Sequence, residues 1–200
     1  MITLYHRPRT RSSRFIVLLE ELGAPYRIQP VTTRTPDGSS GRDPANPHPH
    51  GKVPAIDDDG ELVFESAAIA LYLTDKYPAN GIGPVVGDAK RGAYVSWLAY
   101  YCGAMEPAWT MQFLKVDVPP VMAGWPPTDD VMALVNRTLE AGPYILGDRF
   151  SAADILIATT FAMFMGGPLL PATPLLEGYV KRVTERPAYV RAAAKDEVAA

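Results

Sequence analysis

A short segment near the N-terminus concentrates side chains that attract an anion. Residues 7–14 read Arg-Pro-Arg-Thr-Arg-Ser-Ser-Arg, so four arginines stand beside the hydroxyl groups of Thr10 and Ser12. Guanidinium groups beside a cleft would raise the local electrostatic potential for an anionic ligand. A solvated surface patch is an equally ordinary interpretation of the arginines, and Ser12 could simply cap the helix that follows.

A second group of polar residues lies around a predicted strand-to-helix junction. Residues 51–56 read Gly-Lys-Val-Pro-Ala-Ile, and Glu65-Ser66 follows them. The strand that begins at Val53 can offer backbone N–H and C=O groups to an extended peptide ligand. Ser66 is placed at a helix N-terminus, where free N–H groups and the helix dipole favour a carboxylate. Taken singly, Pro54 could be an edge-strand proline and Ser66 only an N-cap.

The histidines do not indicate a metal centre. His48 and His50 stand in a His-Pro-His run, and His6 is the third histidine in the chain. Cys102 is the only cysteine, so a closed zinc site is disfavoured and no metal is expected.

Periodicity predicts two domains that carry these residues. Strand patterns lie at residues 2–5, 26–31, 53–56 and 62–64, and helical patterns begin at Ser12 and Ser66. Asp59-Gly60 predicts a hairpin between the last two strands. No further strand pattern follows Gly81-Ile82-Gly83-Pro84, and the rest of the chain reads as helices. We therefore expect an α/β domain at 1–79 (βαβ-ββα), a linker at 80–87 and an all-α domain at 88–200.

Several features in this order resemble the cytosolic glutathione S-transferases. They are Leu4-Tyr5, Arg14 through Leu19-Glu20-Glu21-Leu22-Gly23, Asn46-Pro47 through Pro54, Glu65-Ser66, and Ser151 with Asp154. The resemblance covers nearly the whole chain. It implies a thioredoxin-like N-terminal domain, an all-helical C-terminal domain, glutathione as co-substrate and a homodimer.

The resemblance also implies roles for the residues at the junction. Val53 and a cis Pro54 would present the backbone edge to the cysteinyl part of glutathione. Ser66 would bind the γ-glutamyl carboxylate and Glu65 the γ-glutamyl ammonium. The glycyl carboxylate would lie near His50 and Lys52, as the family commonly holds it.

The resemblance further implies that the loop at residues 7–14 makes the glutathione thiol nucleophilic, because a free thiol is mostly protonated at neutral pH. The loop has no cysteine, which argues against the class that uses one and favours a bacterial type with Ser or Thr. We expect Ser12, narrowly ahead of Thr10, to donate to the thiolate, with Arg11 adding positive potential. Tyr5 is the other donor, although a tyrosine at a strand end is more often packed.

The hydrophobic substrate would contact the aromatic helical stretch at residues 90–113. Most of its side chains should be core or dimer contacts. Tyr100, Met105 and Trp109, with Tyr5, are the pocket candidates, because ligand pockets are mostly apolar. Asp154 is expected to close a capping box and to serve folding.

Composition narrows the class of protein. The 200 residues have 48% hydrophobic side chains, a net charge of −3 and a pI near 5.6, which give no footprint for nucleic acid. No apolar run suits a membrane span, and one cysteine suits a reducing compartment, so a cytoplasmic protein is expected.

The leading hypothesis is a transferase that joins the glutathione thiolate to small hydrophobic electrophiles. A glutathione-dependent lyase, isomerase or reductase, with aryl-ether or peroxide substrates, is one alternative. A non-catalytic glutathione-binding or regulatory protein is another. The 20 prolines mark boundaries of the predicted domains, and the dense segment from Pro119 to Pro127 has no assigned role.

Overall fold

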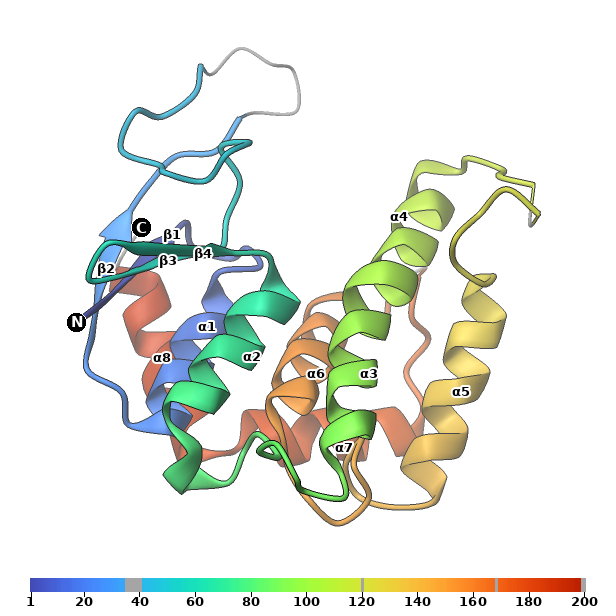
Figure 1. Ribbon diagram of the computed structural model, residues 1–200. Helices are drawn as coiled ribbons and strands as arrows, with labels where there is room; N and C mark the ends of the chain where they lie inside the picture. The colour runs from blue at the N-terminus through green and yellow to red at the C-terminus, as the bar shows by residue number, and fades with distance from the viewer. Residues whose placement is uncertain (35–40, 120, 168, 199–200) are drawn as a thin grey trace. The chain divides into compact units, whose positions relative to one another are not determined.

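A four-stranded mixed sheet lies at the centre of the N-terminal part of the chain (Figure 1). The structure is a computed structural model, and it describes residues 1–34, 41–119, 121–167 and 169–198. The sheet order is β2-β1-β3-β4. Its strands are β1 (Ile2–His6), β2 (Tyr26–Pro30), β3 (Ala55–Asp58) and β4 (Glu61–Phe64). Strand β1 pairs in parallel with β2 and antiparallel with β3.

Helix α1 (Ser13–Leu22) connects the two parallel strands and packs by its apolar face. Its apolar side chains at positions 15–19 and 22 are buried. Gly23 ends the helix in the left-handed conformation, with φ at 61°, which glycine adopts without a Cβ penalty. The Ala24 N–H then donates to the Leu19 carbonyl at 3.1 Å and closes the last turn.

The β3–β4 hairpin confirms the Asp-Gly signal. Asp58 pairs with Glu61, so only Asp59 and Gly60 form the turn. Both have positive φ, at 52° and 101°, as the tight hairpin turn requires.

The chain's last helix completes the N-terminal unit. Figure 1 shows α1, α2 (Ser66–Lys76) and α8 (Pro187–Val198) on one side of the sheet. Helix α8 packs against α1, and the compact unit comprises Met1–Asn80 with the chain from Arg186 onward. The compact unit groups α8 with the sheet, whereas the sequence placed residues 88–200 together, because α8 contacts α1 and periodicity showed only that it is a helix.

The second unit, Gly81–Glu185, is helical in its described residues. Its elements are α3 (Arg91–Tyr100), a π-helical turn (Tyr101–Met105), α4 (Glu106–Leu114), α5 (Thr128–Glu140), α6 (Ala152–Phe164) and α7 (Pro174–Thr184). The long predicted helix is therefore one helical stretch with a π-turn inside it. The combination of a mixed sheet and a helical unit confirms the expected fold class.

Helix α6 is the buried centre of the helical unit. The capping box at its start is present as expected. Asp154 accepts hydrogen bonds from the N–H groups of Ser151 and Ile145, both at 2.8 Å, and from Tyr179 Oη at 3.1 Å. Burial raises the pKa of Asp154 to about 6, against the lowering effect of these donors.

Candidate active site

Three neighbouring strands end or begin at the same end of the sheet, and this places the three sequence segments with candidate site residues next to one another. Tyr5 near the end of β1 pairs with Ala55 at the start of β3, and Ala55 pairs with Phe64 at the end of β4. The β1–α1 loop, the Val53–Pro54 bond and the β4–α2 junction are continuous with these three residues. Strand register therefore assembles one candidate site from segments far apart in the chain.

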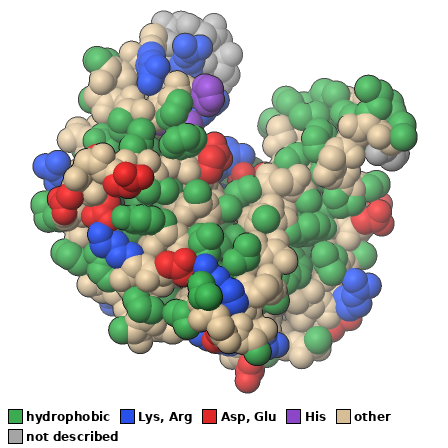
Figure 2. All heavy atoms as spheres, in the orientation of Figure 1, with side chains coloured by type: hydrophobic (Ala, Val, Ile, Leu, Met, Phe, Trp, Pro, Cys, Tyr) green, Lys and Arg blue, Asp and Glu red, His purple; other side chains and the backbone are tan. Residues whose placement is uncertain are grey.

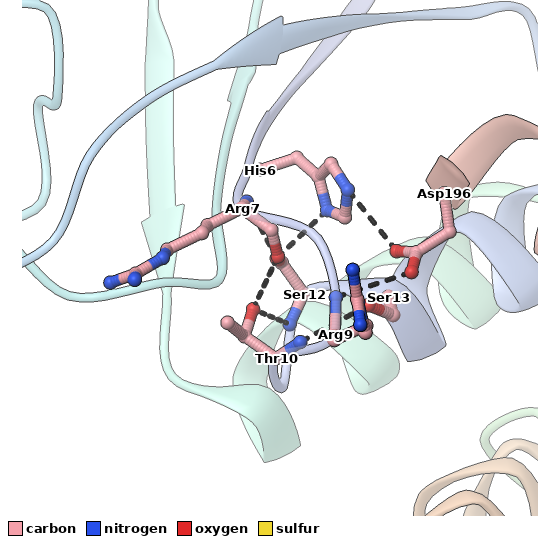
Figure 3. A network of polar contacts seen from close by, with 7 residues as sticks. All are labelled: His6, Arg7, Arg9, Thr10, Ser12, Ser13 and Asp196. Carbon is pink, nitrogen blue, oxygen red and sulfur yellow. Dashed lines mark hydrogen bonds and ion pairs between the residues drawn. The ribbon is translucent and has the colours of Figure 1, made fainter. Parts of the chain in front are cut away.

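The β1–α1 loop is held by hydrogen bonds around two hydroxyl groups (Figure 3). Thr10 Oγ1 donates to the Arg7 carbonyl at 2.7 Å and lies 2.8 Å from Ser12 Oγ. The Ser12 N–H donates to Thr10 Oγ1 at 3.3 Å. These contacts fold residues 7–12 into a compact turn at the start of α1.

Ser12 occupies the interior of this turn. Its exposed fraction is 0%, and its Oγ accepts from the Arg7 N–H at 3.1 Å and lies 2.9 Å from His6 Nδ1. A hydroxyl that is buried and engaged in this way is not available to a ligand in solution. Thr10, by contrast, is half-buried.

His6 is the residue of this loop that the sequence analysis did not assign. It is fully buried at the end of β1. Burial lowers the pKa of His6, although the nearby Asp196 carboxylate acts to raise it. The sequence around His6 did not indicate a role for it, because its partners come from the start of α1 and from the end of the chain.

The Val53–Pro54 peptide bond is cis, as the resemblance implied. The chain before it is fixed by buried polar side chains. Asn46 Nδ2 donates to the Lys52 carbonyl at 3.1 Å, and Asn46 Oδ1 accepts from the His48 N–H at 3.0 Å. Asn46 thus holds the chain segment before the Val53–Pro54 bond at two backbone positions, Lys52 and His48.

His48 is a structural residue, whereas His50 and Lys52 are exposed. The His48 ring packs edge-on against Phe64 with centroids 5.4 Å apart, and its Nδ1 accepts from the His50 N–H at 3.0 Å. Burial lowers the pKa of His48, against the raising effect of Glu65. A neutral His48 therefore shapes the loop, and His50 and Lys52 remain open to a carboxylate.

Glu65 and Ser66 lie where β4 passes into α2. Ser66 is the first residue of α2 and is buried, beside the N–H groups that a helix start leaves unpaired. Glu65 is exposed and has φ 73° and ψ 131°, a region that a residue with a Cβ adopts at a cost of about 1–3 kcal/mol. Strain of this kind concentrates at ligand-binding positions.

The four residues expected in the hydrophobic pocket do not share one environment. Met105 and Trp109 are 0% and 8% exposed, and the Trp109 ring packs on Phe161 at 5.6 Å. These two form the core of the helical unit, and their helical spacing could not separate core from pocket. Tyr100 is half-buried and packs edge-on against Trp97, and Tyr5 is half-buried in β1.

The proline-dense segment borders a cavity that the sequence did not predict. The cavity measures about 220 Å³ and lies within the helical unit. Its lining includes Met111 from α4 and Trp125, Pro126 and Pro127 from the segment, of which residue 120 lies outside the described part. Figure 2 shows hydrophobic side chains gathered over this end of the helical unit. The exposed ones are Phe113, Leu114, Val116, Val121 and Met122.

Metal and membrane features are absent from the described residues. Residues 1–34, 41–119, 121–167 and 169–198 contain no group of three or more His, Cys, Asp or Glu placed to hold a metal ion. None of the helices in this part of the chain is both long and apolar enough to cross a membrane.

Comparison with known proteins gives consistent matches along the chain. Residues 10–76 match the family "Glutathione S-transferase, N-terminal domain", and residues 121–187 match "Glutathione S-transferase, C-terminal domain". The chain is 27% identical to glutathione S-transferase GstA of Escherichia coli O157:H7, covering 92% of this chain and 93% of the relative. It is 30% identical to probable glutathione S-transferase GSTF2 of Oryza sativa subsp. japonica, covering 72% and 71%.

A solved structure supports the same relationship. A sphingomonad glutathione S-transferase complexed with glutathione superposes with a TM-score of 0.78 at 26% identity. The superposition covers 98% of this chain and 99% of that one.

Proposed function

The chain belongs to the glutathione S-transferase family, and we propose that it joins the glutathione thiol to small hydrophobic electrophiles. The glutathione thiolate attacks an electrophilic carbon, a carbon–sulfur bond forms, and the leaving group departs with its electron pair. The thiol proton passes to solvent. The relatives are named transferases, so the lyase, reductase and non-catalytic alternatives are not favoured.

The observation that carries this proposal is the row Tyr5–Ala55–Phe64 across the sheet. Glutathione is an extended tripeptide with two carboxylates and one ammonium group, so it needs several separate contacts held at fixed spacing. The row gathers at one edge a hydroxyl-bearing loop, a backbone edge and a helix N-terminus. An arrangement of this kind positions an extended anionic ligand.

We assign the contacts residue by residue. The Val53 backbone pairs with the cysteinyl unit beside Pro54, the Ser66 helix start binds the γ-glutamyl carboxylate, and Glu65 pairs with the ammonium group. The glycyl carboxylate lies opposite the exposed side chains of Lys52 and of His50, the latter in its protonated form.

Thr10 is the residue that we place against the sulfur. Its hydroxyl is half-buried, and its proton, donated to the Arg7 carbonyl at 2.7 Å, can turn toward a thiolate. A hydroxyl hydrogen bond to the charged form and the positive end of α1 both lower a thiol pKa. The exposed Arg11 adds positive potential, and the chain is thus of the Ser/Thr type with threonine as the donor.

The electrophile is expected to be small and apolar. Tyr100 and Tyr5 are the half-buried aromatic candidates, and the cavity bordered by Trp125 is apolar over most of its lining. The oligomer is proposed to be a homodimer in the cytoplasm. The edge strand β4 supports a dimer, because it borders with α2 an open groove that includes Leu62, Phe64 and Leu71.

Calorimetric titration with glutathione, followed by ultraviolet titration of the bound thiol, tests the function. We expect binding below millimolar concentration and a bound thiol pKa below the free value of about 8.5. Aromatic halides, peroxides and aryl ethers then separate the reaction classes, and turnover of the halides alone is expected. Absence of binding at millimolar glutathione would contradict the proposal.

A further inference from the structure

The last helix of the chain reaches the loop that we propose to activate the thiol. Asp196 of α8 lies 187 residues after Arg9 in the chain, yet its Oδ2 accepts from the Arg9 N–H at 3.2 Å (Figure 3). Its Oδ1 lies 3.2 Å from His6 Nε2. The Asp196 side chain is 16% exposed and that of His6 is 0% exposed. One carboxylate therefore contacts both sides of the β1–α1 loop.

The position of Asp196 determines which nitrogen of His6 carries the proton. A carboxylate oxygen beside Nε2 stabilises the tautomer with the proton on Nε2, because the other tautomer would place two lone pairs against each other. His6 Nδ1 is then an acceptor 2.9 Å from Ser12 Oγ, and it shares the single Ser12 proton with the Arg7 carbonyl, to which Ser12 Oγ donates at 3.1 Å. Asp196 Oδ1 and His6 Nε2 are in electrostatic contact at 3.2 Å but form no hydrogen bond with each other, so Asp196 acts on Ser12 only through the charge that it places beside the His6 ring.

These contacts shape the surroundings of Thr10. The Ser12 oxygen accepts from the Arg7 N–H at 3.1 Å and lies 2.8 Å from Thr10 Oγ1. Thr10 has a single hydroxyl proton, which it donates to the Arg7 carbonyl at 2.7 Å. Ser12 thus keeps the Thr10 oxygen in place while that proton turns from the Arg7 carbonyl toward a thiolate.

The second contact of Asp196 holds the loop backbone. Arg9 has φ at 55°, a conformation that costs a residue with a Cβ about 1 kcal/mol or more. Such a conformation persists only where its surroundings fix it. The bond from the Arg9 N–H to Asp196 supplies that restraint one residue before Thr10.

Ion pairs to α1, from α8 and from Arg186 just before it, set where Asp196 lies. Arg186 forms two bonds to Glu21, at 2.5 and 2.9 Å. Arg191 and Lys195 contact the carboxylate of Glu20, at 2.8 and 2.5 Å. The helix is thus anchored to α1 at several points, from Arg186 just before its start to Lys195 next to Asp196.

We propose that Asp196 and His6 are positioning residues for thiol activation: from the C-terminal helix, they orient Ser12 and restrain Arg9 so that the Thr10 hydroxyl is presented to the glutathione sulfur. This inference rests on the proposed function. It assigns a role in the reaction to a segment that belongs by sequence to the far end of the chain.

The test is the Asp196→Asn variant of the full-length protein, with the pKa of bound glutathione as readout. The amide keeps an oxygen for Arg9, but its NH2 group favours the opposite His6 tautomer. We expect the bound thiol pKa to rise by about half a unit or more toward 8.5. We also expect kcat/KM to fall by roughly tenfold, while the dissociation constant of glutathione changes less than twofold.

Two control variants separate positioning from folding. Glu197→Gln removes the neighbouring, exposed charge on α8 and should leave the thiol pKa unchanged. Arg191→Gln weakens the anchoring of α8 away from the loop and should lower the melting temperature with little effect on the thiol pKa. Equal thiol pKa shifts in Arg191→Gln and Asp196→Asn would overturn the inference, because Asp196 would then only anchor the helix.

A second variant covers the case in which Asp196→Asn fails to fold. His6→Asn keeps an acceptor near the position of Nδ1 but loses the contact with Asp196, and it should raise the thiol pKa as well. In the variant that combines His6→Asn with Asp196→Asn, the two increases in thiol pKa should not add. If the wild type binds no glutathione, or leaves its thiol near 8.5, the proposed function itself fails. If the wild type lowers the thiol pKa and Asp196→Asn does so equally, only the role of Asp196 is overturned.

Discussion

Two hydroxyl groups two positions apart have different surroundings in this protein. Ser12 is completely buried and Thr10 is half-buried, although both precede the same helix. Sequence placed both in the loop, and the choice between them depended on which hydroxyl faces solvent. That orientation follows from the partners of Ser12, namely His6 and Arg7.

The first prediction contrasts these two positions. Thr10→Val should raise the pKa of bound glutathione and leave the free energy of unfolding nearly unchanged, since it removes a half-exposed donor. Ser12→Ala should lower the free energy of unfolding by about 1–3 kcal/mol, because it leaves the buried His6 Nδ1 and the Arg7 N–H without their partner. Thiol titration and urea denaturation of both variants measure the contrast. The assignment is wrong if Thr10→Val leaves the thiol pKa at the wild-type value.

The second prediction concerns the strained backbone at Glu65. Glu65→Gly relieves the positive φ and should raise the free energy of unfolding by up to about 1 kcal/mol, while it weakens glutathione binding through loss of the carboxylate. Glu65→Gln keeps the Cβ and should weaken binding without the gain in stability. Denaturation and calorimetry on the pair distinguish strain from charge. Unchanged glutathione affinity in both variants would remove Glu65 from the site.

At the scale of elements, α8 is attached to the sheet unit by charge. Burial acts to raise the pKa of Glu20, but hydrogen bonds from Lys195, Arg191 and Tyr26 outweigh it and lower the pKa to about 2. A carboxyl group whose folded-state pKa is lowered adds stability that is complete above its unfolded value and is lost as pH falls toward the folded value. For Glu20 this window runs from 4.5 down to about 2.

The third prediction follows from the lowered pKa of Glu20. Glu20→Gln should lower the free energy of unfolding at pH 7 by about 1–3 kcal/mol, a range that allows for solvent screening of its half-exposed partners. The difference from the wild type should shrink between pH 4.5 and pH 2. Denaturant titrations at pH 7 and pH 3 measure it, and a difference that is constant with pH would contradict the assignment.

The fourth prediction concerns the start of α6. Asp154 is fully buried, and its Oδ2 accepts from both the N–H and the hydroxyl of Ser151. Asp154→Ala should lower the free energy of unfolding by about 2–4 kcal/mol, because it leaves several buried donors unpaired. Glutathione affinity of the fraction that remains folded should match the wild type. A loss of affinity without a loss of stability would assign Asp154 to the site.

At the scale of the whole molecule, both ends of the chain lie in one unit. The sheet unit takes residues up to Asn80 and from Arg186 onward, and the helical unit is inserted between them. The three tryptophans, at positions 97, 109 and 125, all belong to the helical unit. Tryptophan fluorescence therefore reports on that unit alone.

The fifth prediction uses this division. A chain that ends after Glu185 should lose glutathione binding, because the sheet unit loses the helix that packs on α1. Its tryptophan emission should still change cooperatively on denaturation. Calorimetry and fluorescence-detected unfolding measure the two effects. Retained glutathione affinity would show that α8 is dispensable for the site.

Much of the architecture could be predicted from local patterns. Alternating and helical periodicity located the strands and helices, Asp59-Gly60 located the hairpin, and Ser151 with Asp154 located the capping box. These signals are local because backbone geometry and side-chain burial repeat over a few residues. The ordered motifs also sufficed for the family and for its glutathione co-substrate.

Other properties depended on contacts between distant parts of the chain. Burial of Ser12, Met105 and Trp109, the attachment of α8 to the sheet unit, and the approach of Asp196 to His6 have no local signature. Each is decided by which surfaces meet after the helices pack, and periodicity describes an element's faces but not its neighbours. The sequence therefore identified the parts of the candidate site, and tertiary packing determined which of the two hydroxyl groups is buried and what surrounds it.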